Sequence, residues 1–199
     1  MRHLSMVGGQ PERGATLIEL FITLTLLGII LAAVCSSFVS QRKVAAVQNQ
    51  RSVLVQQAQA AMDLLTRELR RAGTNPTGTA FPSGTYPVTY SATQLEIRAN
   101  LDKSNDTTAD TDEHLIYAYD STNKRISRNA GNGAQPLVEN IRAFTFGYLD
   151  SAGNATTVSS AIRQLQISIT TQTAAADPRD TTNNGYRTFT MTSLINLRN

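Results

Sequence analysis

The feature that most constrains this chain is a stretch of twenty residues, 20–39, that contains no charged side chain. An α-helix rises 1.5 Å per residue, so twenty residues span about 30 Å, the thickness of the hydrocarbon core of a bilayer. The stretch therefore predicts a helix that is long and apolar enough to cross a membrane.

The segment in front of this stretch does not fit an ordinary secretory signal. Residues 1–14, MRHLSMVGGQPERG, are short and polar, and Arg2 and Arg13 are set against Glu12. A secretory signal has its small-residue cleavage site after the apolar region, whereas here the glycines and the charges come before it. Cleavage, if it occurs here, leaves the apolar helix on the mature protein.

The junction between the polar and apolar segments has the pattern G-ATLIEL. Its residues are Gly14, Ala15, Thr16, Leu17, Ile18, Glu19 and Leu20. This pattern, followed at once by an uninterrupted apolar helix, resembles the processing signal of type IV prepilins. The resemblance implies that a membrane peptidase cuts after Gly14 and that the new amine of Ala15 is methylated. Most members of the family have Phe at this position, where this chain has Ala15.

Glu19 is an acidic residue within an otherwise apolar helix. A carboxylate costs about 2.5–3.5 kcal/mol at the middle of a bilayer and less near the interface, so it needs a partner. The resemblance implies that Glu19 accepts the N-terminal amine of a neighbouring subunit and so sets the axial register of a filament. The alternative is that Glu19 lies one turn inside the membrane and reaches the headgroups without a further role.

An apolar stripe continues beyond the membrane segment with the period of a helix. Its members are Val44, Val47, Leu54, Ala58, Met62, Leu65 and Leu69. No proline occurs between Pro11 and Pro76, and the sequence RRAG at 70–73 is typical of a helix end. We expect one helix over about residues 15–72, with its second half packed on a domain.

After Pro76 the composition changes to Thr, Asn, Ser, Gly and Asp with short alternating runs. The predicted strands are 94–99, 115–119, 125–128, 143–149, 162–170 and 186–196. Turn sequences at 120–124 and 150–154 indicate hairpins. The expected fold is α+β: a long N-terminal helix with an antiparallel β-sheet head packed on its C-terminal half.

Three later segments carry a second, finer resemblance. LLTRELRRAGTNP, PLVENIRAFTFGYLDSAGN and IRQLQISI resemble PilW-type minor pilins and, more distantly, the J-type pseudopilin of type II secretion. The implied parts are a leader at 1–14, a membrane or filament-core half-helix at 15–39, an amphipathic half-helix at 40–75 and a β-rich periplasmic head at 76–199. The implied location is the inner membrane, crossed once, and then the pilus tip.

The resemblance implies a minor pilin that joins a tip or priming complex and starts filament assembly. Its partners would be other minor pilins, the major pilin, the prepilin peptidase and methyltransferase, and the inner-membrane assembly platform. The alternatives are a type II secretion pseudopilin and a tip adhesin or DNA-capture subunit. Nucleic acid is not favoured, because a net charge of +3 is spread along the chain without a basic run.

An acidic segment in the head has the spacing of a calcium loop. The candidate ligands are Asp102, Ser104, Asp106, Asp110 and Glu113, with Thr108 between them. The glycine that such a loop needs is replaced by Thr107, and the following HLIYAYD alternates like a strand instead of a helix. The alternative is a solvated acidic loop without a metal, and no other cofactor is expected.

Residues suited to catalysis are scarce. The chain has a single cysteine, Cys35, inside the apolar stretch, and two histidines, of which His3 precedes the predicted cleavage site. It has no G-x-S-x-G sequence and no glycine-rich phosphate loop. We therefore expect a protein that is not an enzyme.

Overall fold

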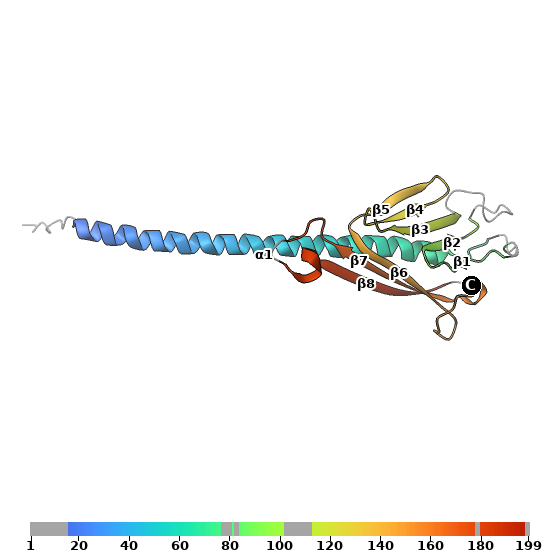
Figure 1. Cartoon of the computed structure of the whole chain (residues 1–199). Helices are drawn as coiled ribbons and strands as arrows, with labels where there is room; N and C mark the ends of the chain where they lie inside the picture. Colours follow the sequence, from blue (N-terminus) through green and yellow to red (C-terminus); the bar gives the residue numbers. More distant parts are fainter. Residues whose placement is uncertain (1–15, 77–80, 82–83, 102–112, 178–179, 198–199) are drawn as a thin grey trace, which may run out of the picture. The chain divides into compact units, whose positions relative to one another are not determined.

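The computed structural model describes residues 16–76, 81, 84–101, 113–177 and 180–197 (Figure 1). The chain divides into two compact units, Met1–Gln48 and Asn49–Asn199. The helix α1, Leu17–Arg71, begins in the first unit and ends in the second. This confirms the expected long helix.

The end of α1 is built from the residues that predicted it. Gly73 adopts φ 75°, a left-handed conformation that glycine adopts without steric cost. The N–H of Thr74 donates to the carbonyl of Arg71 at 2.9 Å, and the N–H of Gly73 donates to the carbonyl of Arg98 at 3.0 Å. The carbonyl of Arg71 and the N–H of Gly73 are therefore both satisfied where the chain leaves the helix.

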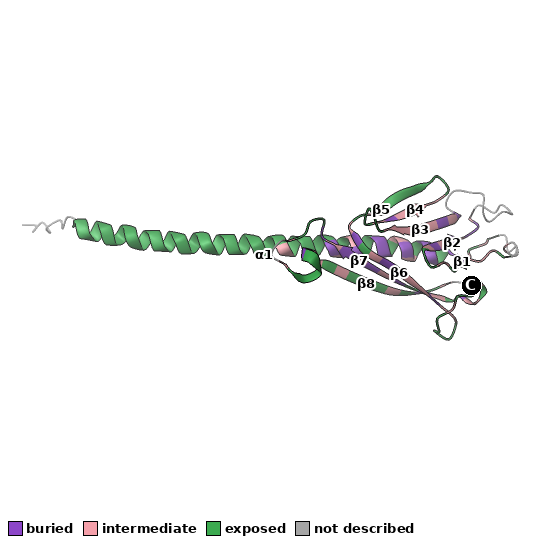
Figure 2. Cartoon of the chain, in the orientation of Figure 1, coloured by how far each residue is buried: buried purple, intermediate pink, exposed green. Residues whose placement is uncertain are grey.

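The two parts of α1 differ in burial (Figure 2). In the first unit every described side chain is exposed except that of Val47, which is half-buried. From Leu54 onward one face is buried, and Ala58, Leu65 and Leu69 are each 0% exposed. The predicted stripe is thus a packing face from Leu54 to Leu69, whereas its first member, Val44, is exposed.

The head contains two antiparallel sheets where the sequence predicted one. The first has the order β1-β2-β3-β4-β5, and the second has the order β6-β7-β8. The strands of the first sheet are β1 Val88–Thr89, β2 Gln94–Arg98, β3 His114–Asp120, β4 Arg125–Asn129 and β5 Ala134–Val138. Those of the second are β6 Ile141–Leu149, β7 Gln164–Gln172 and β8 Thr188–Asn196. The α+β class with antiparallel strands is confirmed.

The hydrophobic core of the second unit lies where α1 and both sheets meet (Figure 2). Alternate side chains of β2, β3 and β7 face it, as expected for strands with one solvated face. The fully buried members include Leu65, Leu69, Leu95, Ile97, Tyr117, Ile126, Ile141, Leu165, Ile167 and Ile169. Helix and strands therefore bury their apolar faces against one another.

Tyrosine hydroxyls tie the two sheets together. Tyr148 of β6 donates to the carbonyls of Ser91 and Gln94, at 3.2 and 3.3 Å. Tyr119 of β3 donates to the carbonyls of Ile141 and Arg142, at 3.1 and 2.8 Å. Each bond links a loop or strand of one sheet to a strand of the other.

Several strand predictions need correction. The strand predicted at 162–170 is β7, Gln164–Gln172, because a 3-10 turn at Ser159–Ala161 places Ile162 before the strand. The strand predicted at 186–196 begins only at Thr188. Strands β1 and β5 were not predicted: β1 has two residues, and β5 contains Pro136.

Candidate functional site

The predicted processing and assembly motif is the first turn of α1. Thr16 precedes the helix, and its N–H and hydroxyl donate to Glu19 Oε2 at 3.2 and 3.3 Å. The N–H of Glu19 in turn donates to Thr16 Oγ1 at 3.4 Å. This reciprocal arrangement is a capping box, which satisfies orphan donors at a helix start. Glu19 therefore has a local role in addition to the one predicted for it.

The spacing T-x-x-E is itself a signal for a capping box, so the sequence contained the information for this contact. The Glu19 carboxylate also lies in the first turn of α1, where negative charge is stabilised by the helix dipole. Both effects hold the carboxylate near the beginning of the helix. The side chain is exposed, so the capping contact leaves it accessible to another chain.

The helix that follows Glu19 presents apolar side chains in all directions. Phe21 is 70% exposed, Leu24 59% and Ile29 67%. By length and composition α1 can cross a membrane, and it is the single such helix among the described residues. The hydroxyl of Thr23 donates to the carbonyl of Leu20 at 2.8 Å, so this polar group is satisfied within the helix.

One family in the comparison with known proteins covers most of this architecture. The chain matches the family described as prepilin peptidase-dependent protein B over residues 47–193, well over half of its length. The chain belongs to this family. The matched region runs from within α1 to β8 and leaves out the G-ATLIEL motif, so motif and match are separate observations. No curated protein matches the chain.

Membership of the prepilin peptidase-dependent protein B family makes this a pilin-like protein, for which an apolar N-terminal helix is a fitting membrane anchor. The predicted cleavage site, Gly14 and Ala15, lies outside the described residues. Thr16, Leu17, Ile18 and Leu20 are described, and all are exposed. Cleavage, methylation and the assembly role of Glu19 remain predictions.

The calcium candidates of the head fall almost entirely outside the described residues. Asp102, Ser104, Asp106 and Asp110 are not described, and only Glu113 is. Glu113 is 2% exposed, and its Oε1 accepts the N–H of Leu101. Among the described residues no group of three or more His, Cys, Asp or Glu side chains is placed to hold a metal ion. The calcium loop thus remains an untested hypothesis.

A cluster on the outer face of the first sheet was not predicted. Glu96 accepts a hydrogen bond from Arg98, and His114 Nε2 lies 2.6 Å from Glu96 Oε1. Arg98 and His114 are opposite each other in the register of β2 and β3. The spacing of Glu96 and Arg98, two residues apart on one strand face, was the available signal. The cluster joins neighbouring strands and pairs its charges internally.

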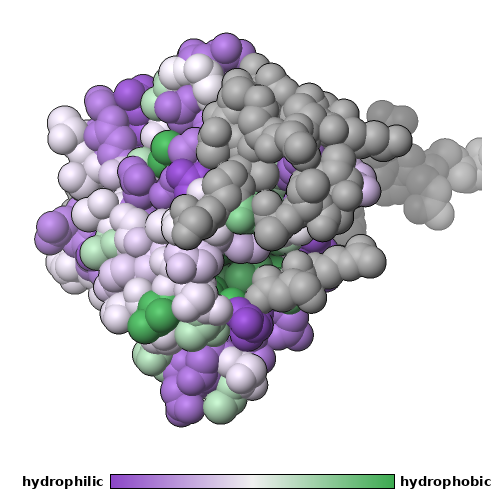
Figure 3. Space-filling model, turned by 90° about the vertical axis from the view of Figure 1, so that its right-hand side faces the viewer, coloured by the Kyte–Doolittle hydropathy of each residue, from purple (hydrophilic) through white to green (hydrophobic). Residues whose placement is uncertain are grey.

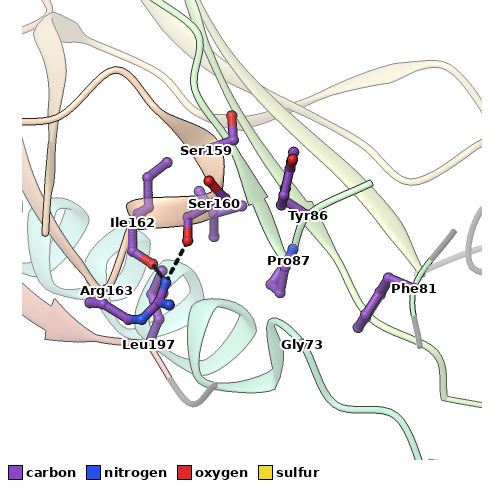
Figure 4. A pocket seen from close by; sticks show the side chains of 10 residues that line it. Gly73, Phe81, Tyr86, Pro87, Ser159, Ser160, Ile162, Arg163 and Leu197 are labelled. Carbon is purple, nitrogen blue, oxygen red and sulfur yellow. Dashed lines mark hydrogen bonds between the residues drawn. The ribbon is translucent and has the colours of Figure 1, made fainter. Parts of the chain in front are cut away.

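The far end of the head carries an open pocket of about 360 Å³ (Figure 4). Its walls include Tyr86, Pro87 and Leu197. Arg163 points its Nη1 at the carbonyls of Ser160 and Ile162, at 2.9 and 2.8 Å (Figure 4). The guanidinium is therefore used to hold the local turn. The described lining contains no carboxylate, histidine or cysteine, so it presents no acid–base pair.

Two arginines of the first sheet, Arg125 and Arg128, are each paired with a carboxylate. Arg125 lies 3.2 Å from Asp120, and Arg128 lies 3.0 Å from the buried Glu68 of α1. Figure 3, which views the head from its far end, shows hydrophilic and pale areas with small hydrophobic ones between them. These two ion pairs reduce the net positive charge that Arg125 and Arg128 offer to a phosphate backbone.

Proposed function

We propose that this protein is a minor pilin of a type IV pilus. It is stored in the inner membrane on the first part of α1, with its head in the periplasm, and then enters a tip or priming complex that starts the filament. Its partners are other minor pilins, the major pilin, the prepilin peptidase and methyltransferase, and the assembly platform. It acts by assembly and without enzymatic turnover.

The observation that carries this proposal is the contrast between a capped, acidic first turn and the apolar surface behind it. Ile18, Leu20 and Phe21, beside Glu19, are between 57% and 70% exposed. Contiguous apolar surface of this extent marks contact with a membrane or with other protein. Membership of the prepilin peptidase-dependent protein B family supports a filament subunit over an unrelated membrane anchor.

In this proposal Glu19 has one hydrogen-bond partner in the stored subunit and another in the filament. In the stored subunit its carboxylate accepts the bonds from Thr16, at 3.2 and 3.3 Å, and so stays close to the start of the helix. In the filament it accepts the positive amine of a neighbouring subunit, processed to begin at Ala15. The amine is charged whereas the Thr16 donors are neutral, so an ion pair in the filament adds coulombic attraction that favours the exchange.

Two substitutions separate capping from charge. Glu19→Gln retains a side chain that completes a capping box but lacks the charge, and Glu19→Ala removes both. We expect both variants to be processed and stored normally but to enter filaments poorly, while Thr16→Ala, which removes the capping hydroxyl and retains the charge, has a smaller effect. The measurement is the amount of processed variant in sheared filaments relative to the membrane pool.

Normal incorporation of Glu19→Gln would contradict the charge role and leave capping as the function of Glu19.

A deletion strain then tests whether the protein serves a type IV pilus or a type II secretion system. We expect loss of surface pili, restored by the wild-type gene, with secretion of exoproteins unchanged. Loss of secretion with intact pili would instead identify a type II secretion pseudopilin, and would overturn the minor-pilin proposal.

A further inference from the structure

The two sheets of the head have four edge strands, and three of them are protected. An edge strand exposes unpaired main-chain groups that attract other strands, and proteins block it by shortness, proline, bulges or cover. Strand β1 has two residues, and β5 contains Pro136 opposite a register shift in β4. Neither offers a long, regular row of free main-chain groups.

The third edge, β6, is interrupted and partly covered. Its register with β7 shifts between Ile141 and Ala143. The N–H of Ile141 donates to the carbonyl of Lys124 at 2.7 Å, and the carbonyl of Tyr148 accepts the N–H of Thr156 at 2.9 Å. Groups at both ends of β6 are thus already used within the chain.

The fourth edge, β8, has none of these devices. All nine of its residues pair with β7 without a register shift, from Thr188 opposite Gln172 to Asn196 opposite Gln164. Its sequence, TFTMTSLIN, contains no proline, glycine or charged residue. A long, regular and uncharged edge of this kind is suited to main-chain pairing with a further strand.

The register of β7 and β8 also shows which main-chain groups point outward. At one end the N–H of Thr173 donates to the carbonyl of Arg187, and at the other the N–H of Leu197 donates to that of Arg163, both at 2.9 Å. Because bonding alternates along an antiparallel strand, odd-numbered residues of β8 bond to β7 and even-numbered ones face away. The outward residues are Thr188, Thr190, Thr192, Leu194 and Asn196. No hydrogen bond within the described part of the chain reaches their outward groups.

The sheet face beside this edge is also uncharged. On β8 and β7 the exposed side is built from Thr, Ser, Gln, Asn196 and Leu194, which is 57% exposed. Thr190 and Thr170 join their hydroxyls at 2.9 Å, and the hydroxyl of Thr192 donates to Ser168 at 3.0 Å. Charged residues are depleted at the centres of protein interfaces, so this face suits an uncharged partner strand.

The direction of β8 decides against antiparallel pairing between two copies. The hydroxyl of Thr171, opposite Phe189 near the start of β8, donates to the carbonyl of Leu54 at 3.2 Å. Leu197, which follows β8, lines a pocket with Gly73. Strand β8 thus runs in the same direction as the head half of α1. Antiparallel β8–β8 pairing would set two α1 helices in opposite directions, which is incompatible with anchoring both in one membrane.

We propose that the outer edge of β8 pairs with an extended segment of a different pilin-like subunit, which adds a fourth strand to the three-stranded sheet. Among the described strands, a second copy offers no other open edge, because its β1, β5 and β6 are protected. The proposal rests on the proposed function, since the partner is another subunit of the same assembly. Main-chain hydrogen bonds hold the two strands together, and the uncharged face of β8 favours a partner strand that is also uncharged.

Hydrogen exchange of the full-length chain tests this pairing residue by residue. In the chain alone in detergent, the amides of Thr190, Thr192 and Leu194 exchange fast, while those of Met191 and Ser193 are protected by β7. In complexes reconstituted with co-expressed pilin-like subunits, we expect all five amides to be protected. Fast exchange of the even-numbered amides in a complex that contains the chain would overturn the pairing and leave the proposed function intact.

A matched pair of variants gives a second test. Thr192→Pro removes an outward N–H and so blocks a partner strand, but it removes no main-chain hydrogen bond to β7. Thr192→Val retains the N–H. Both lose the hydroxyl bond to Ser168. We expect incorporation into the complex to fall about tenfold for the proline variant relative to the valine variant, from the loss of one to two hydrogen bonds. Circular dichroism and melting of both variants check that the head remains folded.

Three further results would overturn the pairing, the choice of partner or the proposed function. Equal incorporation of the two folded variants would overturn the proposal. Concentration-dependent protection of the even-numbered amides in the chain alone would indicate a second copy and would overturn the choice of partner. Failure of the wild-type chain to enter any complex of pilin-like subunits would overturn the proposed function, and with it this inference. A proline variant that unfolds is replaced by Thr190→Pro against Thr190→Val, to which the same criteria apply.

Discussion

The two parts of α1 show how one helix can be made for two surroundings. In the first unit the apolar side chains point in all directions and are exposed: Leu24 is 59% exposed and Leu27 52%. In the second unit the apolar side chains form one stripe, and Leu65 and Leu69 are 0% exposed. The apolar side chains of the second part are buried by the chain itself, whereas those of the first part can be buried only by a membrane or by another protein.

This difference separates stability from assembly. Burial of a leucine side chain contributes about 1.5–3 kcal/mol, so the stripe from Leu54 to Leu69 holds the head together. The exposed leucines of the first part contribute nothing comparable to the folding of the isolated chain. Substitutions in the second part should therefore lower the stability of the head, whereas substitutions in the first part should impair assembly.

The largest expected effect is from a matched leucine pair. Leu65→Ala should lower the free energy of unfolding of the head by about 2–5 kcal/mol, because it leaves a cavity in the core. Leu27→Ala should leave that free energy within about 0.5 kcal/mol of wild type. Denaturant unfolding of the full chain in detergent measures both. Equal losses would show that the first part also packs within the chain.

A matched arginine pair should give an intermediate effect. Arg128→Met removes the partner of Glu68, whose side chain is 6% exposed, and should cost about 1–3 kcal/mol because a carboxylate is left buried. In the first part, Arg42 lies 5.3 Å from the centre of the Phe38 ring. Arg42→Met should not change the unfolding of the head. A neutral Arg128→Met would mean that water or another group compensates Glu68.

The smallest expected effect concerns Tyr148. Tyr148→Phe loses the bonds to Ser91 and Gln94 and should cost about 0.5–1.5 kcal/mol. Burial raises the pKa of Tyr148 from 10.0 to about 12. A raised pKa means that the folded state favours the neutral phenol, so the stabilisation is complete below pH 10.0 and is lost as the pH rises to about 12. The head should lose less stability in this range in the Phe variant. An identical alkaline profile would exclude Tyr148 as a source of the loss.

The helix and its packing face were predictable because their signals are local. The 3.6-residue spacing of Leu54, Ala58 and Leu65 and the glycine at Gly73 lie within the helix or next to it. The turn at Asp120 was predictable for the same reason: its Oδ1 accepts the N–H groups of Thr122 and Asn123, at 3.1 and 3.0 Å.

The division into two sheets was not predictable, because it depends on contacts far apart in the sequence. Strand β5 is mostly exposed and contains Pro136, so it lacks the alternation that marks a strand. The pair Glu68–Arg128 joins residues 60 positions apart. At the candidate site, the sequence predicts the motif around Glu19, and the spacing T-x-x-E also carries a local signal for its capping contact with Thr16.

The central claim is that a processed, apolar first part of α1 serves assembly, and the intact mass of the protein tests it most directly. The chain is expressed with and without its prepilin peptidase, and the mass and N-terminus are read. We expect a mature chain that begins at Ala15 when the peptidase is present, with the added mass of a methyl group, and the full 199 residues without it. A chain that still carries residues 1–14 in the presence of the peptidase would contradict the account and remove the assembly role proposed for Glu19.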